Sequence, residues 1–391
     1  MVDRKNSKTG LDRRQFSGGL AALGLGAALP SGPARAYQGP NVIIVRFGGG
    51  VRRAETIEPQ TTFAPYLLNE LSARGVLIPN MTISALEGVE TSHAEGTLNI
   101  LTGRYLAYKK LPSPFAQQHL EPQAPTLFEY FRKAFDMPAH QALLINGEDR
   151  PQEEFFTYGV HAHYGLAFRS ESLSLYRFKL YKLRRQLAAN DGSDEELALA
   201  KKEFDKLMSR DYRGLGARQS PEIEAFWGRW QAHYGRSGFV NPRGDRLLTE
   251  LALRALDELH PRLMMVNYQD PDYVHWGNAS HYTRAIAIID TELKRLVDHV
   301  DADPRLAGNT VFVVVPDCGR DANPMMEVPF QHHFNTKAAH QIWALLFGPG
   351  IVRGRVLDKP KDQTAIAATV AGLMGFRATG AETGAITELF A

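Results

Sequence analysis

Acidic and histidine side chains follow two apolar segments in the C-terminal third of the sequence, and a further histidine precedes another. Asp272 and His275 follow the first segment, Asp317 and Cys318 follow the second, and His340 stands before the third. Carboxylate oxygen, imidazole nitrogen and thiolate sulfur are ligands of zinc and similar divalent ions. Such an ion polarises a phosphoryl or sulfuryl oxygen and lowers the pKa of bound water. The pattern therefore predicts a divalent metal site, with zinc as the expected ion.

These five residues do not carry equal weight. Asp272, His275 and His340 form one predicted ligand set, with Asp317 close to it. Each Asp or His taken singly is better explained by a helix cap, a turn or a satisfied polar group, so the prediction depends on their combination at successive strand ends. Cys318 could ligate as a thiolate, but a single cysteine at a strand exit is typical of a small buried residue.

Two hydroxyls precede a helix-like segment that runs from His93 to Leu101. The free backbone amides at a helix N-terminus stabilise an approaching anion, and a nearby metal activates an oxygen nucleophile. Thr91 and Ser92 are therefore candidate nucleophiles, although either could simply cap the helix. His93 could instead be a metal ligand or an acid or base, and a water nucleophile would need no side-chain hydroxyl.

Arg320 is a candidate clamp for an anionic group, because it closely follows Asp317 and a guanidinium presents several donors at once. The run Gly48-Gly49-Gly50 follows an apolar segment but lacks the G-x-x-x-x-G-K-[ST] pattern, so a nucleotide-binding P-loop is not predicted. These glycines are expected to allow a sharp turn or a close backbone approach to a ligand.

Bringing these side chains together requires strands whose carboxyl ends meet at one edge of a sheet. Strands are predicted over 41–47, 263–268 and 310–315, which are short β-branched or apolar runs. Amphipathic, helix-like segments alternate with the strand-like runs, at 66–74, 93–101, 245–259 and 282–300. We therefore predict an α/β fold, a three-layer sandwich with a mostly parallel central sheet and helices on both faces. The site is expected in the crevice at the strand ends.

Between about 171 and 234 the composition changes to charged, helix-forming sequence. Ser193 followed by Glu196 is a capping-box pattern at the head of a long amphipathic run. We predict a helical insertion here. Its charges are typical of a solvated face, and the same helices could also form a cap over the site that selects substrates.

The first 36 residues have the layout of a cleaved export signal, with a basic start, a moderately apolar stretch and small residues ending at Ala36. The adjacent Arg13 and Arg14, followed by Phe16 and an apolar stretch diluted by glycines, are typical of a twin-arginine signal. We predict a signal peptide at 1–36, an α/β domain at 37–391 and export by the twin-arginine machinery, to the periplasm or otherwise out of the cytoplasm. A general secretory signal or an uncleaved anchor is the alternative.

Composition excludes several classes of partner. Lys and Arg total 45 against 43 for Asp and Glu, so the net charge of +2 gives no basis for binding nucleic acid. A small anionic ester would have to be attracted by the site itself. No apolar run of 18 residues occurs after the N-terminal segment, so no stable membrane span is expected. With Cys318 as the single cysteine, no intramolecular disulfide can form.

The order of the motifs resembles the alkaline phosphatase superfamily, in particular a sulfatase-like, uncharacterised bacterial branch exported by the twin-arginine route. In that superfamily a strand ends in an Asp and a His, the next ends in Asp-His-Gly, and a later His precedes a strand leading to a Gly-Pro-Gly-like turn. The matching residues here are Asp272 and His275, Asp317-Cys318-Gly319, His340 with Gly348-Pro349-Gly350, Leu101 to Tyr105, and Asp362 to Gly375. The resemblance implies a metal-dependent hydrolase of phosphate or sulfate esters.

This chain departs from the superfamily pattern at two strand ends and at the nucleophile. The Asp that ends the first strand and ligates a second metal is replaced by Phe47 or Gly48, and Asp-His-Gly has become Asp-Cys-Gly. The position of the superfamily's nucleophile falls on His93. The second metal site is therefore in doubt, although further side chains could complete it in a rearranged way, namely Glu55, Glu327, His332 or His333. A catalytically impaired binding or structural module is the alternative function, and a mutase or transferase using a phosphorylatable hydroxyl is a third.

Overall fold

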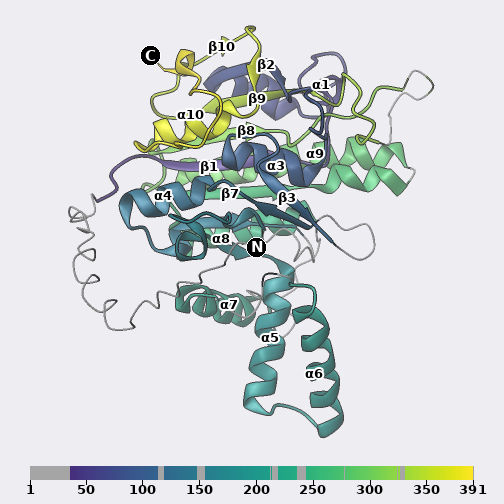
Figure 1. The fold of residues 1–391 in the computed structure, drawn as a ribbon, viewed down its shortest axis with the longest axis vertical. Coiled ribbons are helices and arrows are strands. Elements are labelled where there is room, and N and C mark those ends of the chain that lie inside the picture. The colour runs from purple at the N-terminus through teal and green to yellow at the C-terminus, as the bar shows by residue number, and fades with distance from the viewer. Residues whose placement is uncertain are drawn as a thin grey trace, which may run out of the picture. The chain divides into compact units, whose positions relative to one another are not determined.

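The apolar runs of the sequence form the strands of one large sheet, which crosses the middle of Figure 1. The computed structural model describes residues 36–390 except 113–118, 148–154, 212, 214–218, 236–243, 277, 324 and 326–330. The predicted signal segment, residues 1–36, therefore lies outside the described residues except for Ala36. Within the described part, no helix has both the length and the hydropathy needed to span a membrane.

In the described residues nine strands form this sheet. Its order is β10 (Arg355–Val356), β2 (Gly75–Thr82), β9 (Gln341–Phe347), β8 (Thr310–Val315), β1 (Asn41–Phe47), β7 (Leu263–Tyr268), β5 (Ala142–Ile145) and β6 (Glu171–Leu173), with β11 (Lys361–Asp362) also paired to β2. The central strand β1 is parallel to both neighbours, β7 and β8. β9 runs antiparallel to β8 and β2, so the mostly parallel sheet is confirmed with one reversal that the sequence pattern did not indicate. A small antiparallel pair lies apart, β3 (Tyr108–Leu111) with β4 (His119–Pro122).

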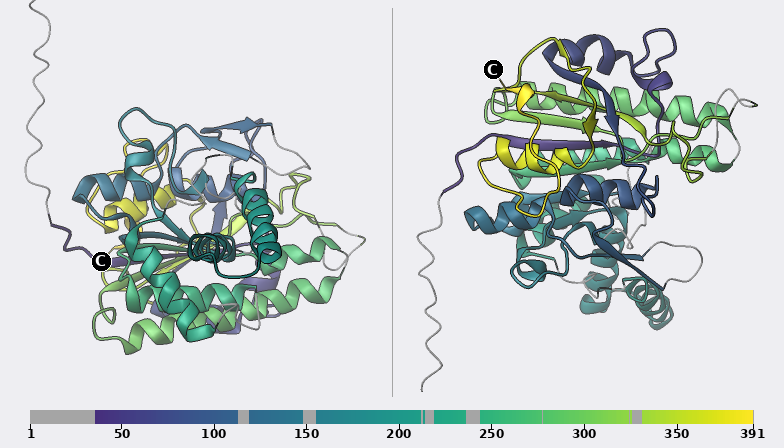
Figure 2. Two further views of the ribbon diagram at one scale, coloured as in Figure 1. Left: turned by 90° about the horizontal axis from the view of Figure 1, so that it is seen from below. Right: turned by 45° about the horizontal axis from the view of Figure 1, so that its top comes forward.

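Helices cover both faces of the sheet, which confirms the three-layer sandwich (Figure 2). Alternate residues of β1 point to opposite layers: Ile43 and Val45 join one core cluster, and Val42 and Ile44 join the other. The first layer contains α1 (Arg53–Thr56), the π-helical turn Leu67–Leu71 with α2 (Ser72–Arg74), α8 (Asp245–Glu258) and α9 (Ala279–Ala302). The second contains α3 (His93–Thr102), α4 (Leu127–Phe135) and α10 (Ala365–Leu373). Short 3₁₀ turns lie at Ala139–Gln141, Gly165–Phe168, Asp270–Trp276 and Thr387–Leu389.

The charged segment between about 171 and 234 is largely helical. It contains α5 (Leu175–Ala189), α6 (Asp194–Met208) and α7 (Pro221–Tyr234), and α5 and α6 project together from the rest of the domain in Figure 1. The expected capping box is present at the start of α6, where Ser193 and Glu196 bond reciprocally. The first residues of the predicted insertion, Glu171–Leu173, instead form the edge strand β6, so the helices begin at Leu175.

Helix α3 lies unusually close to the segment that leaves β8. A Cβ atom placed on Gly96 would be 2.0 Å from the carbonyl oxygen of Asp317, so only a residue without a side chain allows this approach. Ser92 caps the N-terminus of α3 by accepting a hydrogen bond from the backbone NH of Glu95. The helix therefore begins at His93 with its first turn directly above the carboxyl ends of the central strands.

We predict that Gly96→Ala destabilises the protein, because the new methyl group forces α3 away from Asp317. Overpacking of this kind typically costs about 1–3 kcal/mol. Gly372→Ala is the matched control, since Gly372 also lies in a helix but has open space around its Cβ position. That control should be neutral or gain up to about 1 kcal/mol from helix propensity. Urea unfolding of both variants tests the expectation, and equal stability of the two would contradict the close packing of α3.

Candidate metal centre

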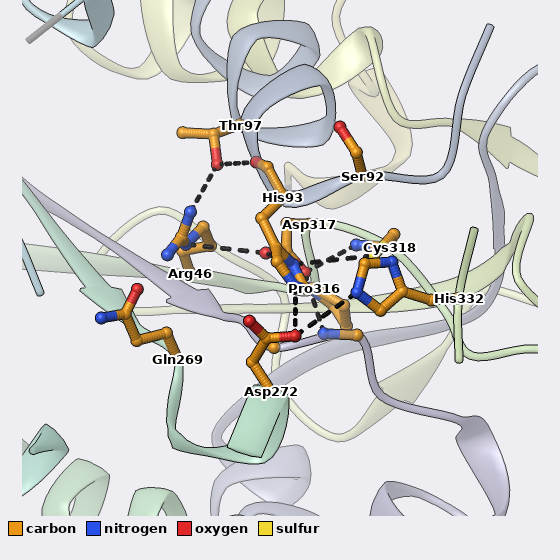
Figure 3. Close-up of polar contacts among 12 residues, drawn as sticks. Arg46, Ser92, His93, Thr97, Gln269, Asp272, Pro316, Asp317, Cys318 and His332 are labelled. Atoms are coloured by element: carbon orange, nitrogen blue, oxygen red, sulfur yellow. Dashed lines mark hydrogen bonds and ion pairs between the residues drawn. The ribbon is translucent and has the colours of Figure 1, made fainter. Parts of the chain in front are cut away.

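Five side chains from four segments of the chain meet at the carboxyl edge of the sheet. Figure 3 labels His93, Asp272, Asp317 and His332 among them. His93 begins α3, Asp272 and His275 lie on the 3₁₀ helix Asp270–Trp276 after β7, Asp317 follows β8, and His332 lies between β8 and β9. Residues three apart on a 3₁₀ helix project from the same side. Asp272 and His275 can therefore face the same point.

Three imidazoles surround one oxygen of Asp272. The Nε2 atoms of His93, His275 and His332 lie 2.9, 2.8 and 3.4 Å from Asp272 Oδ1. The potential ligand atoms of these four residues all lie within 4.8 Å of one another. One carboxylate and three imidazoles form a donor set that suits a divalent ion such as zinc, so the residues present fit a metal site.

The charge and burial of these four side chains favour the binding of a cation. Burial alone would raise the pKa of Asp272, but the facing imidazoles of His93, His275 and His332 lower it far below its usual value. Burial, with repulsion from His93, lowers the pKa of His332 to about 3, so that its imidazole is neutral. The pKa of His93 is raised well above its usual value: burial opposes the charge, but Asp272 and Asp317 outweigh it. An ion bound here would displace the proton on His93 Nε2.

A second group consists of His93, Asp317 and Cys318. Nδ1 of His93 donates to Oδ2 of Asp317 at 2.8 Å, and the Cys318 sulfur lies 3.9 Å from the same nitrogen. Burial raises the pKa of Asp317 while His93 and Arg46 lower it, with a net value of about 2. Burial, with repulsion from Asp317, raises the pKa of the Cys318 thiol to about 11. Cys318 is therefore a protonated, fully buried thiol at neutral pH.

His340 does not join this cluster. Its Nδ1 lies 3.2 Å from the carbonyl oxygen of Ile83, and it belongs to neither group of potential ligands. His332, eight residues earlier in the same connection, occupies the corresponding place beside Asp272. Of the other side chains considered for a second site, Glu55 pairs with Arg52 and Tyr282, and Glu327 lies outside the described residues.

The two candidate hydroxyls are engaged away from the cluster. Thr91 Oγ1 donates to the carbonyl oxygen of His332 and lies 3.0 Å from Asn335 Oδ1. Ser92 Oγ donates to the carboxylate of Glu95 at 2.9 Å, and Figure 3 shows it pointing away from His93 and Asp317. Ser92 has the helix-capping role that was the alternative to a nucleophile.

Arg320 is fully buried and supports the glycine loop instead of facing an anion. Its guanidinium donates to the carbonyl oxygens of Gly50 at 2.8 Å, of Gly49, and of Pro271 at 3.3 Å, and it lies over the Tyr282 ring. A guanidinium whose NH groups donate to backbone carbonyl oxygens cannot also donate in a bidentate way to a substrate anion. The predicted anion clamp is therefore corrected to a structural role.

Arg46 is the site residue that sequence reasoning missed. It is fully buried in β1, its Nη1 donates to Thr97 Oγ1 at 2.8 Å, and its Nε lies 3.8 Å from Asp317 Oδ2. A charged residue near the end of an otherwise apolar strand was the available signal, because buried charges are found where they have a partner.

Similar solved structures share the fold at low sequence identity, whereas the sequence matches no protein-family model and no curated protein. A protein of the alkaline phosphatase superfamily from Vibrio parahaemolyticus aligns with TM-score 0.52 and 14% identity over 92% of this chain and 72% of its own. The alkaline phosphatase PafA aligns with TM-score 0.51 and 12% identity over 91% of this chain and 100% of its own. The chain has the fold of the alkaline phosphatase superfamily. The 2-O GAG sulfatase BT1596 also aligns with it, with TM-score 0.51 and 11% identity, over 90% of this chain and 72% of its own.

Packing accounts for one departure from the superfamily pattern. The Asp that the resemblance places at the end of the first strand corresponds here to Phe47, which is buried in the apolar core, or to Gly48, whose Cβ would lie 2.2 Å from the carbonyl oxygen of Tyr268. The same Cβ would lie 3.1 Å from Asp317 Oδ2 and 3.0 Å from Arg46 Nε. A side chain at this position would collide with the backbone, so no carboxylate can be supplied from it without rearrangement.

We predict that Asp272→Asn abolishes tight ion binding and that His340→Ala preserves it. Asp272 is the carboxylate that three imidazoles face, so its loss should weaken binding by more than the roughly 100-fold that outer-shell changes cause. Zinc titration of chelator-treated protein, followed by elemental analysis, measures both variants. Loss of the ion in both variants would support the sequence-based set of Asp272, His275 and His340 instead, whereas retention in Asp272→Asn would contradict both ligand sets.

Cys318→Ser should change ion affinity by less than about 10-fold, because Cys318 is not among the four potential ligands that meet at Asp272. The cobalt(II)-loaded wild-type protein should correspondingly lack the intense thiolate charge-transfer absorption in the near ultraviolet. Such absorption, removed by Cys318→Ser, would show that the sulfur binds the ion.

Proposed function

We propose that this protein is a metal-dependent hydrolase of phosphate or sulfate esters. The observation that carries the proposal is the convergence of three imidazoles on Asp272 at the carboxyl edge of an alkaline phosphatase-like sheet. Proteins with the same fold include an alkaline phosphatase and a sulfatase, which supports this reaction class.

His93, Asp272, His275 and His332 would hold the ion. When bound, a divalent ion supplies a Lewis acid for a phosphoryl or sulfuryl oxygen and lowers the pKa of water. Asp317 accepts from His93 Nδ1 and so fixes the orientation of that ring. Because the net charge of the chain is small, an anionic ester would have to be attracted by this centre itself.

Attack by water fits the site better than attack by a side-chain hydroxyl, because Thr91 and Ser92 are both bonded elsewhere. In direct hydrolysis the water oxygen bonds to phosphorus or sulfur and the bond to the alcohol oxygen breaks. The water gives up a proton, and the departing alcohol oxygen takes one up. His333 is exposed, and its ring stacks on that of His275 with centroids 5.5 Å apart. Burial and the charge of His93 lower the pKa of His333, so its neutral imidazole can exchange this proton with solvent.

We also propose that the protein acts outside the cytoplasm after twin-arginine export. The paired arginines and apolar stretch of residues 1–36 support this route. The candidate ligands come from segments far apart in the sequence, so the centre is complete only in folded protein. A pathway that carries folded proteins would allow the ion to be loaded before export.

A binding module that holds an ion without turnover is the second candidate function. Gly48 in place of a carboxylate and the engaged hydroxyls of Thr91 and Ser92 favour it, because both remove groups that the superfamily pattern uses. Both candidate functions require metal binding, and only the hydrolase requires turnover of an ester.

The test is hydrolysis of p-nitrophenyl phosphate, bis(p-nitrophenyl) phosphate and p-nitrophenyl sulfate by the purified protein. At least one ester should be hydrolysed, chelation should abolish turnover and zinc should restore it. Asp272→Asn should lower kcat/KM by about 100-fold or more, in the range of loss found for groups that stabilise transition-state charge. Ser92→Ala is the control and should retain activity within about 10-fold.

Bound ion with no turnover of any ester would favour the binding module. Abolition of turnover by Ser92→Ala, together with loss of a covalent phosphoryl label, would instead indicate a hydroxyl nucleophile and favour the mutase or transferase reading.

A further inference from the structure

The carboxylate of Asp317 is surrounded by groups of the protein itself. Oδ1 accepts from the backbone NH of Cys318 at 2.8 Å and from that of Gly50 at 3.4 Å. Oδ2 accepts from His93 Nδ1 at 2.8 Å and lies 3.8 Å from Arg46 Nε. A carboxylate offers about four lone-pair sites. Because Asp317 accepts three hydrogen bonds, has a guanidinium beside it and is fully buried, little of its capacity remains for an ion.

His93 connects Asp317 to the other carboxylate. With Nδ1 donating to Asp317, the opposite nitrogen, Nε2, is directed to Asp272 at 2.9 Å. Histidines that bind metals commonly donate their second ring NH to a carboxylate, which fixes the tautomer and the ring orientation. The two carboxylates therefore differ in their surroundings. Asp272 contacts three imidazoles, whereas Asp317 contacts only one imidazole, that of His93, on the side opposite to Asp272.

Arg46 fills the space on the far side of Asp317. Nη1 donates to Thr97, one helical turn after His93 on α3, and Nη2 donates to the carbonyl oxygen of Tyr268 at 3.5 Å. Nε has no hydrogen-bond partner and faces Asp317. An arginine remains charged even when buried, so this is a fixed cation next to the carboxylate.

A second ion beside Asp317 would have to take its other ligands from His93 Nδ1 and the Cys318 sulfur, because the end of β1 supplies no carboxylate at Gly48. A Cβ on Gly48 would lie 3.0 Å from Arg46 Nε and 2.2 Å from the Tyr268 carbonyl oxygen. The Cys318 thiol is buried, with its sulfur 3.9 Å from His93 Nδ1, and that nitrogen already donates to Asp317. The site beside Asp317 thus contains a guanidinium where a binuclear centre would contain a metal.

We propose that this centre binds one divalent ion, through Asp272, His275, His332 and His93 Nε2, and that Arg46 supplies the positive charge of a second ion. Asp317 and Arg46 are then positioning residues that act through His93, and neither contacts the ion. The inference rests on the metal site of the proposed function and does not depend on turnover.

The experiment measures how many ions the full-length protein binds. Chelator-treated wild type, Asp317→Asn, Arg46→Met and Arg46→Lys are titrated with zinc by calorimetry, and the ions bound are counted by native mass spectrometry. Wild type should bind one equivalent. Asp317→Asn should also bind one, with about 10–100-fold lower affinity, which is the range for loss of an outer-shell partner.

Arg46→Met and Arg46→Lys distinguish the effect of the positive charge at position 46 from the effect of side-chain packing there. Arg46→Met should accept a second, weaker equivalent, because the buried carboxylate of Asp317 is left without a compensating cation. Arg46→Lys should remain at one equivalent. Visible spectra of the cobalt(II)-loaded forms provide a second readout, since loss of His93 orientation in Asp317→Asn should change the ligand-field bands.

Two equivalents in wild type, falling to one in Asp317→Asn, would overturn this inference and leave the proposed hydrolase intact. A single equivalent in Arg46→Met would show that Arg46 does not occupy the place of an ion. If Arg46→Met does not fold, the count in wild type and Asp317→Asn still decides. One bound ion without ester hydrolysis would overturn the proposed activity and leave the one-ion centre standing, whereas no bound ion would overturn both.

Discussion

The buried contact between His93 Nδ1 and Asp317 Oδ2 is the interaction on which the arrangement of the site depends. It joins the first turn of α3 to the segment leaving β8, two elements separated by more than two hundred residues. The contact requires a helix that lies almost on the sheet, which Gly96 permits, and a helix start at position 93, which the Ser92 cap defines. Loss of the close approach at Gly96 would displace the ring that links the two carboxylates.

Charge balance explains why a fully buried carboxylate is tolerated at this point. Asp317 would be costly in an apolar interior, and it is stabilised by a guanidinium, an imidazole and backbone NH groups instead of by solvent. Arg46 in turn is held by Thr97, which lies on the helix that carries His93. Strand, helix and loop are therefore coupled through one polar network inside an otherwise apolar core.

The central strands were predictable because they are buried on both faces. The runs at 41–47, 263–268 and 310–315 are strands β1, β7 and β8 with the expected bounds, and their polar exits place Asp272, His275 and Asp317 together. Strand direction was not predictable for β9, since hydrophobic periodicity is the same in parallel and antiparallel strands.

The sequence named His332 only as a possible member of a second site and could not place it beside Asp272. His332 lies in a polar segment with no periodic pattern, whereas His340 stands directly before an apolar strand and so matched the superfamily spacing. The distance along the chain could not distinguish them, because only the path of the connection decides which imidazole reaches Asp272. Arg46 could be recognised in the sequence as a charged residue within an apolar run. Its role could not be predicted, because that required knowing that Asp317 follows the neighbouring strand β8.

The reversal of β9 has a topological consequence for this edge of the sheet. Because β8 and β9 are antiparallel neighbours, the connection between them starts and ends at the same edge, and it carries both Asp317 and His332. An ion held jointly by His332 and the 3₁₀ helix after β7 would close a long loop of the chain and remove conformational entropy from its unfolded form. In a protein with a single cysteine, such an ion would act as a reversible cross-link, the role that a disulfide cannot have here.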